Sequence, residues 1–127
     1  MLQQAAITVM LPVKNLERAR AFNEKSLGFE PGERHADGKY VYMAAGAYLA
    51  LFPKEEGTRA EHTAISFKVD DIAKAIRELQ TRGVTFADYD YPGLQTVDHV
   101  CVLGAEKAAW FNDTEGNCLC LHEDVEK

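Results

Sequence analysis

Hydrophobic and polar residues alternate in two separate stretches of the chain. In residues 5–13, AAITVMLPV, one face carries Ile7, Val9, Leu11 and Val13. In residues 62–69, HTAISFKV, the matching face carries Thr63, Ile65, Phe67 and Val69. A period of two is typical of a strand with one buried face. Both stretches are therefore predicted to be strands.

A one-sided helix follows each of these strands. Apolar residues recur three and four positions apart near residues 15–27 and again near 71–82. Each segment starts at a side chain suited to cap a helix, Asn15 or Asp71, and ends before a glycine suited to the left-handed C-terminal position. The pattern predicts two helices, each with one apolar face.

Two similar hairpins follow further along the chain. Residues 42–53, YMAAGAYLALFP, and 110–123, WFNDTEGNCLCLHE, both read as two strands around a glycine. Each half of the chain thus reads strand, helix and three strands.

This duplication predicts an α+β fold made of two βαβββ modules. The modules span about 5–54 and 61–123, joined by the charged segment KEEGTRAEH, and together form a single domain of residues 1–127. We expect a cupped, mainly antiparallel sheet with the helices on its outer face and the opposite face free.

The second half contains one additional segment, residues 89–106. Pro92 and Gly93 interrupt it, and TVDHVCV within it is compatible with a short extra strand. Such a segment is either a lid over a binding site, to which Asp98 and His99 would contribute, or an ordinary surface excursion. The sequence leaves both open.

Composition narrows the range of partners and locations. The net charge is −6 with no basic patch, so nucleic acid is not expected as a partner. No apolar run reaches the ~20 residues of a membrane span, and the first residues read as a strand rather than as a targeting peptide. Cys118 and Cys120, two apart on a strand, are poorly placed to bridge, which indicates reduced thiols and a cytoplasmic protein.

Three motifs resemble the vicinal oxygen chelate superfamily, which includes glyoxalase I, extradiol dioxygenases, fosfomycin-resistance enzymes and bleomycin-binding proteins. The motifs are LPVKNLERARAFNEKSLGF, ISFKVDDIAKAIRELQTRGV and AAWFNDTEGNCLCLHE. The resemblance extends over about residues 5–123 and implies the βαβββ duplication. It does not by itself imply one activity, because this fold serves many chemistries.

Enzymes of this superfamily hold a metal ion with His, Gln and Glu side chains from four strands. The matching positions here are Thr8, Ala50, Ala64 and Cys120, and none of them is His, Gln or Glu. The resemblance therefore implies a member without this metal site, and we expect no metal and no cofactor. A zinc site from His62, Cys118, Cys120 and His122 is not expected either, because alternate strand residues lie about 6.6 Å apart.

Strand alternation groups the side chains on the face opposite the helices. The predicted ligand-binding residues are Thr8, Tyr48, Ala50, Phe52, His62, Ala64, Trp110, Cys118, Cys120 and His122. Met10, Ser66 and either Tyr40/Tyr42 or Val41/Met43 are expected on the same face. This set could line a small-molecule pocket or fill a core. The alanines favour open space and hence a pocket.

Two of these residues are also candidate catalytic groups. His62 could act as an acid or base, or could be a hydrogen-bonded residue at the start of a strand. Cys120 could be a nucleophile if a nearby histidine lowered its pKa, or could be an inert buried thiol. Trp110 could stack on a flat ligand or pack in the core.

The sequence thus favours a cytoplasmic, homodimeric protein that binds a small organic molecule without a metal. Its nearest functional analogue is the bleomycin-binding type, which sequesters a drug. The alternative is a glyoxalase-like lyase, isomerase or dioxygenase with an atypical site. A purely protein-binding module has no distinctive motif to support it.

Overall fold

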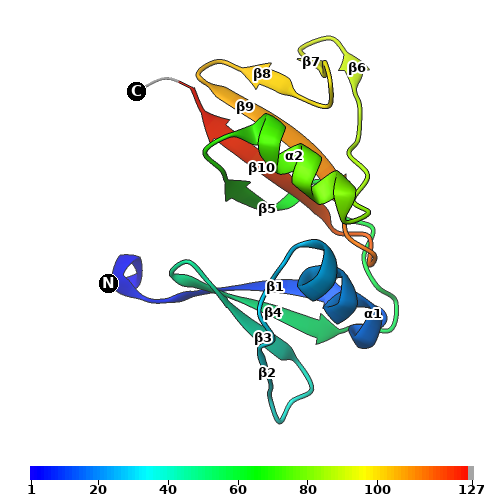
Figure 1. Ribbon diagram of the computed structural model, residues 1–127. Helices are drawn as coiled ribbons and strands as arrows, with labels where there is room; N and C mark the ends of the chain where they lie inside the picture. The colour runs from blue at the N-terminus through cyan, green and yellow to red at the C-terminus, as the bar shows by residue number, and fades with distance from the viewer. Residues whose placement is uncertain (126–127) are drawn as a thin grey trace. The chain divides into compact units, whose positions relative to one another are not determined.

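The computed structural model describes residues 1–125 and divides the chain into two compact units (Figure 1). The N-terminal unit comprises residues 1–59 together with 114–117, and the C-terminal unit comprises residues 60–113 and those from 118 onward. Each unit contains its own four-stranded sheet and its own helix.

The sheet of the N-terminal unit has the strand order β1-β4-β3-β2. Its strands are β1 (Ile7–Val13), β2 (Glu33–Arg34), β3 (Tyr40–Ala44) and β4 (Ala47–Pro53), preceded by a short 3-10 turn, η1 (Leu2–Gln4). β1 runs parallel to β4, and the other two pairs are antiparallel.

The sheet of the C-terminal unit repeats this arrangement with the order β5-β10-β9-β8. Its strands are β5 (Thr63–Lys68), β8 (Cys101–Leu103), β9 (Glu106–Asn112) and β10 (Cys118–Asp124). β5 runs parallel to β10, and the remaining pairs are antiparallel. The α+β fold and the two βαβββ modules predicted from the sequence are thereby confirmed.

The first part of the additional segment forms a separate hairpin, and its later part supplies β8 of the sheet. The hairpin consists of β6 (Asp90–Tyr91) and β7 (Leu94–Gln95). The chain then turns through Asp98 and His99, which both have positive φ, 52° and 71°. The stretch TVDHVCV is therefore a tight turn leading into β8 rather than a strand along its whole length.

Helix α1 (Leu16–Ala21) continues directly into a π-helical turn, η2 (Phe22–Ser26). The extent agrees with the helix predicted near 15–27, but the winding differs. The buried Asn23 side chain donates a hydrogen bond to the carbonyl of Ala19 at 2.8 Å, within the turn where the winding changes. Most π-helical turns lie inside an α-helix, whereas this one forms the last turn of the helix.

The two helix N-caps predicted from the sequence are present in the structure. The side chain of Asn15 accepts a hydrogen bond from the backbone N–H of Arg18 at 3.0 Å. At the start of α2 (Ile72–Thr81), Asp71 accepts one from Lys74 at 3.1 Å. These bonds satisfy backbone donors that the first helical turn leaves without a partner.

Each helix packs on one face of its own sheet, α1 on β4 and α2 on β9 and β10 (Figure 1). The apolar residues buried in the N-terminal unit include Leu11, Val13, Tyr42, Leu49 and Leu51, and those of the C-terminal unit include Ile72, Ile76, Phe111, Leu119 and Leu121. The opposite face of each sheet has no helix of its own. Among the residues described, no helix has the length and apolar character required to span a membrane.

Candidate ligand-binding site

The open face of the N-terminal sheet is defined by the pairing of its strands. Thr8 lies beside Tyr48, and Met43 lies beside the same tyrosine on the other side. Directly paired residues project to the same face of a sheet, and this face is opposite the one that carries Leu49 and Leu51. Of the two alternatives on β3, Val41 and Met43 therefore belong to the open face, and Tyr40 and Tyr42 to the helix side.

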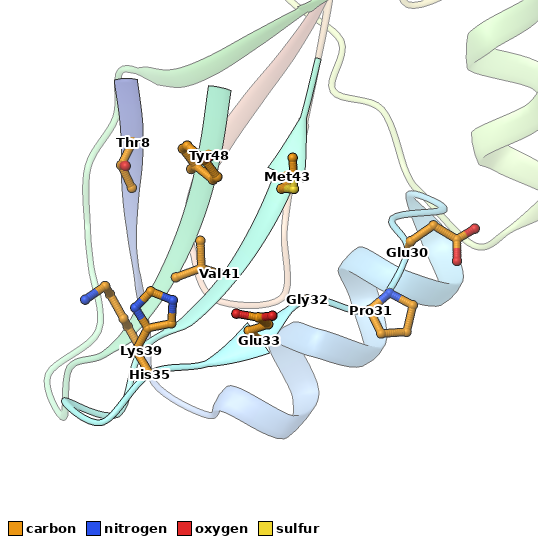
Figure 2. Close-up of a pocket in the computed structure, with 10 residues that line it drawn as sticks. All are labelled: Thr8, Glu30, Pro31, Gly32, Glu33, His35, Lys39, Val41, Met43 and Tyr48. Carbon is orange, nitrogen blue, oxygen red and sulfur yellow. The ribbon is translucent and has the colours of Figure 1, made fainter. Parts of the chain in front are cut away.

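A cavity of about 800 Å³ lies on this open face (Figure 2). It is lined by Thr8, Glu30, Pro31, Gly32, Glu33, His35, Lys39, Val41, Met43 and Tyr48. A volume of this size is within the range of small-molecule sites. Two predicted ligand-binding residues, Thr8 and Tyr48, are part of its wall.

The cavity wall combines an apolar floor with charged groups at its margin. Figure 2 shows His35 and Lys39 close together at one end and Glu30 at the other, with Glu33 between them. The Lys39 amino group also pairs with Asp37 at 2.6 Å. A ligand in this cavity would contact an apolar surface and charges of both signs.

Gly32 determines how closely one wall of the cavity approaches β3. Its N–H donates a hydrogen bond to the Tyr40 hydroxyl at 2.9 Å. A Cβ atom at this position would lie only 1.9 Å from the carbonyl oxygen of Val41. Only glycine fits here without displacing backbone, so Gly32 keeps residues 30–33 against the sheet.

Two further predicted ligand-binding residues of β4 have less exposed surface. Ala50 is completely buried and does not line the cavity. Its burial does not favour the interpretation that the small side chain of Ala50 leaves room for a ligand. Phe52, next on the same face, is half-buried.

The open face of the C-terminal sheet brings together the reactive side chains of β10. Cys120 pairs with Trp110 on β9 and with Ser66 on β5, so the three side chains share one face. Cys118 and His122 lie on the same face by alternation. The hydroxyl oxygen of Ser66 is 2.6 Å from Nδ1 of His122.

A β-bulge brings Thr63 to this open face, although strict alternation along β5 would place it on the helix side. The pairing of β10 with β5 shifts between Cys118 and Leu119, which places Thr63 beside Cys118. The indole N–H of Trp110 donates a hydrogen bond to the Thr63 hydroxyl at 3.1 Å. A bulge changes the face of one residue without altering the hydrophobic pattern, so Thr63 could not be assigned to this face from the sequence.

Tyr89 is a second residue of this face that the sequence did not single out. Its ring packs edge-on against Trp110, with ring centroids 5.5 Å apart. Burial, and then the nearby thiol of Cys118, raise the pKa of Tyr89. The start of the additional segment therefore reaches the open face, whereas His99 pairs with Asp88, just before the segment, at 2.9 Å.

The surroundings of the two thiols of β10 favour the protonated form. Burial raises the pKa of both Cys118 and Cys120, an effect that hydrogen bonds from Thr63 and Ser66 only partly oppose. The Cys120 thiol also donates to the carbonyl of Leu121 at 3.2 Å. Because the thiolate is the nucleophilic form, this environment does not activate Cys120.

The remaining predicted residues of this unit lie at its margin. His62 precedes β5 and is exposed, and Ala64 is half-buried near the bulge. Within the part of the chain described, His62, Cys118, Cys120 and His122 do not form a group of metal ligands. In this part of the chain, the three potential metal ligands that lie close enough to share one ion are Glu106, His122 and Asp124.

Two βαβββ modules with open strand faces define the class of vicinal oxygen chelate proteins that the sequence motifs resemble. Residues 6–121 match the family model of the Glyoxalase/Bleomycin resistance protein/Dioxygenase superfamily. The chain belongs to this superfamily. No curated protein matches it significantly.

Solved structures from several bacteria have the same fold. A superfamily member from Sphaerobacter thermophilus DSM 20745 is 25% identical, with a TM-score of 0.74 over 98% of this chain and 100% of that chain. TnmS3, an antibiotic binding protein from Streptomyces sp. CB03234, is 20% identical, with a TM-score of 0.65 over 98% of each chain. A mutant of the fosfomycin resistance protein FosX from Listeria monocytogenes, complexed with Mn(II) and 1S,2S-dihydroxypropylphosphonic acid, is 15% identical, with a TM-score of 0.67 over 100% of this chain and 93% of that chain.

Proposed function

We propose that this protein binds and sequesters a small organic molecule of antibiotic-like size without using the metal site of its superfamily. The observation that carries the proposal is the cavity of about 800 Å³ on the open face of the N-terminal sheet. Its apolar floor of Val41, Met43 and Tyr48 provides contact area, and charged groups at the margin provide orientation. The antibiotic binding protein among the structural neighbours supports this class of ligand.

The chemistry of the candidate residues supports binding over catalysis. The positions that match the superfamily's metal ligands offer two methyl groups, a hydroxyl and a buried thiol. Burial keeps that thiol, Cys120, protonated. A glyoxalase-like lyase, isomerase or dioxygenase would need an activated group that neither Cys120 nor the exposed His62 supplies.

The proposal extends to the second open face and to the assembly. Trp110, Tyr89 and the thiols of β10 form an apolar and aromatic surface on the C-terminal unit, which could bind an organic molecule by itself. All three cysteines are free, which supports a cytoplasmic protein. The active form is a homodimer, as the superfamily resemblance implies for short members.

The test is a ligand screen combined with a substitution that fills the cavity. Antibiotic-like organic compounds are screened by thermal shift, and compounds that raise the melting temperature are measured by calorimetry. Met43→Trp places a large ring in the cavity at a side chain that is 81% exposed, so the fold should tolerate it while binding falls at least about tenfold. Val102→Trp, at an exposed position outside the cavity, is the matched control.

Two results would contradict the proposal. One is binding that Met43→Trp and Val102→Trp leave equally unchanged. The other is turnover of a screened compound that His62→Ala or Cys120→Ser abolishes while stability is unchanged, which would support the enzyme.

A further inference from the structure

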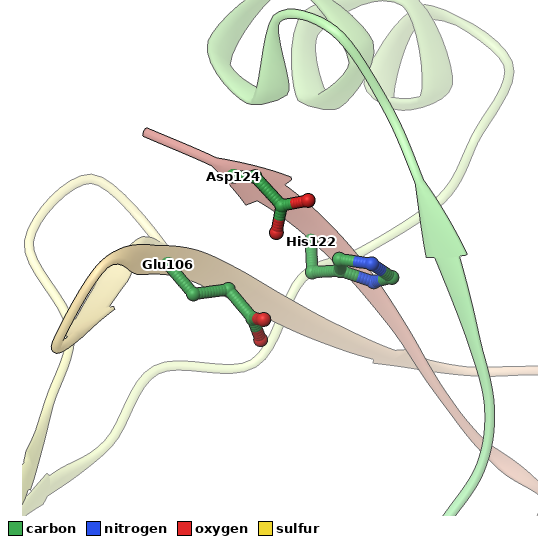
Figure 3. A group of neighbouring side chains, drawn as sticks. All are labelled: Glu106, His122 and Asp124. Carbon is green, nitrogen blue, oxygen red and sulfur yellow. The ribbon is translucent and has the colours of Figure 1, made fainter. Parts of the chain in front are cut away.

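A group of potential metal ligands lies on β9 and β10, apart from the four positions that the superfamily uses. A carboxylate oxygen of Glu106, one of Asp124 and a ring nitrogen of His122 all lie within 4.8 Å of one another (Figure 3). The three side chains come from the paired ends of two adjacent strands, where Glu106 is directly opposite Asp124. His122 is two residues earlier on β10 and therefore on the same face.

The electrostatics of this group favour a cation. Like charges directly opposite each other on neighbouring strands are unfavourable, and Glu106 and Asp124 form such a pair. Asp124 is partly compensated by Lys68, whose amino group is 3.2 Å away. Among the described residues, no basic side chain forms an ion pair with Glu106.

The donors also match the preferences of a particular kind of ion. Two carboxylate oxygens and one imidazole nitrogen suit divalent first-row transition metals, which such ligands hold at about 2.0–2.2 Å. Ligand atoms around such an ion are separated by about 3–4 Å, so small side-chain rotations from the observed positions are sufficient. The hydrogen bond between Ser66 and Nδ1 of His122 already restricts the rotation of the imidazole ring.

We propose that Glu106, His122 and Asp124 form a binding site for a divalent transition-metal ion. Three protein ligands leave the remaining coordination positions to water. The site does not include Thr8, Ala50, Ala64 or Cys120, and it lies in the other unit from the cavity of the proposed function. It is therefore independent of that function.

Metal titration of the whole protein tests the site. Protein treated with EDTA and desalted is titrated with Mn²⁺ and with Co²⁺ by calorimetry, and each should bind at one ion per chain. Glu106→Gln, His122→Gln and Asp124→Asn should each weaken binding at least about tenfold, because each removes one ligand. Glu78→Gln on α2 is the matched control and should bind as the parent does.

Lys68 provides a second, opposite prediction. Because its ammonium group competes for Asp124, Lys68→Ala should strengthen Mn²⁺ binding. Lys74→Ala makes the same change of net charge on α2 and should have a smaller effect. Melting temperatures without metal confirm that all variants fold.

Three outcomes would overturn the proposal. The first is no binding of either ion at millimolar concentration, and the second is binding that Glu106→Gln and Asp124→Asn leave unchanged. The third is a sulfur-to-cobalt charge-transfer band that disappears in Cys118→Ser or Cys120→Ser, which would assign the ion to the thiols.

Discussion

Glu115 is a buried carboxylate in the motif AAWFNDTEGNCLCLHE. It accepts hydrogen bonds from the backbone N–H groups of Lys14 and Asn15, both at 2.8 Å. It also accepts bonds from the Arg18 guanidinium at 2.7 Å and 3.1 Å and from the Thr114 hydroxyl at 2.8 Å. Burial alone would raise the pKa of Glu115, but these donors, Arg18 first, lower it to about 2.

The low pKa of Glu115 makes the free energy of unfolding depend on pH in the acid range. Because the folded pKa is below the ordinary value of 4.5, the carboxylate contributes its full stabilisation above pH 4.5 and loses it as the pH falls toward 2. With a discount for the half-exposed Arg18, the contribution is about 2 kcal/mol. Glu115→Gln should lower the free energy of unfolding by about this amount at pH 7 and flatten its decline between pH 4.5 and 2, as measured by urea denaturation.

The control is Glu78→Gln, which removes an exposed carboxylate on α2. It should leave both the stability and its pH dependence close to those of the parent. An equally steep loss of stability in Glu115→Gln below pH 4.5 would contradict the assignment.

Individual residues show where sequence reasoning succeeds and where it stops. Asn15 and Asp71 were predictable as caps because their hydrogen bonds are made within three residues. Glu115 was not, because its partners lie about a hundred positions earlier and the sequence shows only one more charge in a turn. Thr63 was missed because a bulge changes its face without changing the hydrophobic pattern.

At the scale of elements, α2 depends on its apolar face. Ile72 is 2% exposed at the first position of the helix. Ile72→Asp would bury a carboxylate without a partner, which should cost more than about 3 kcal/mol and leave the chain largely unfolded by circular dichroism. Ala73→Asp, at the adjacent exposed position, should remain folded, and equal loss of structure in both variants would contradict the packing described for α2.

The wall of the N-terminal cavity depends on Gly32. Gly32→Ala would bring Cβ into the carbonyl oxygen of Val41, so residues 30–33 would have to move away from β3. The expected result is a lower melting temperature and weaker binding of any ligand found in the screen. Pro31→Ala, at an exposed neighbouring position, should have little effect on stability, and a Gly32→Ala variant as stable as the parent would refute the close approach.

The elements themselves were predictable to different degrees. The strand and helix periods were clear because each sheet and helix buries one face. The π-helical turn of residues 22–26 was not, because one extra residue in a turn alters the apolar period too little to detect. The β6–β7 hairpin was not predicted, since two-residue strands are too short to show alternation.

At the scale of the whole molecule, the proposed homodimer is directly measurable. The chain has a mass of 14.1 kDa. Light scattering after gel filtration should give twice this mass at micromolar concentrations. A single-chain mass across the whole concentration range would contradict the dimer. That residues 1–127 act as one domain, with modules at about 5–54 and 61–123, also stays a prediction.

The hydrogen bonds of Glu115 affect how the first half of the chain folds while the protein is being synthesised. A ribosome adds Lys14 to the chain 101 residues before it adds Glu115. At 5–20 residues per second this interval is about 5–20 s. During that time the start of α1 has no carboxylate to accept its backbone N–H groups. The first half of the chain can therefore complete its native contacts only after Glu115 has been synthesised.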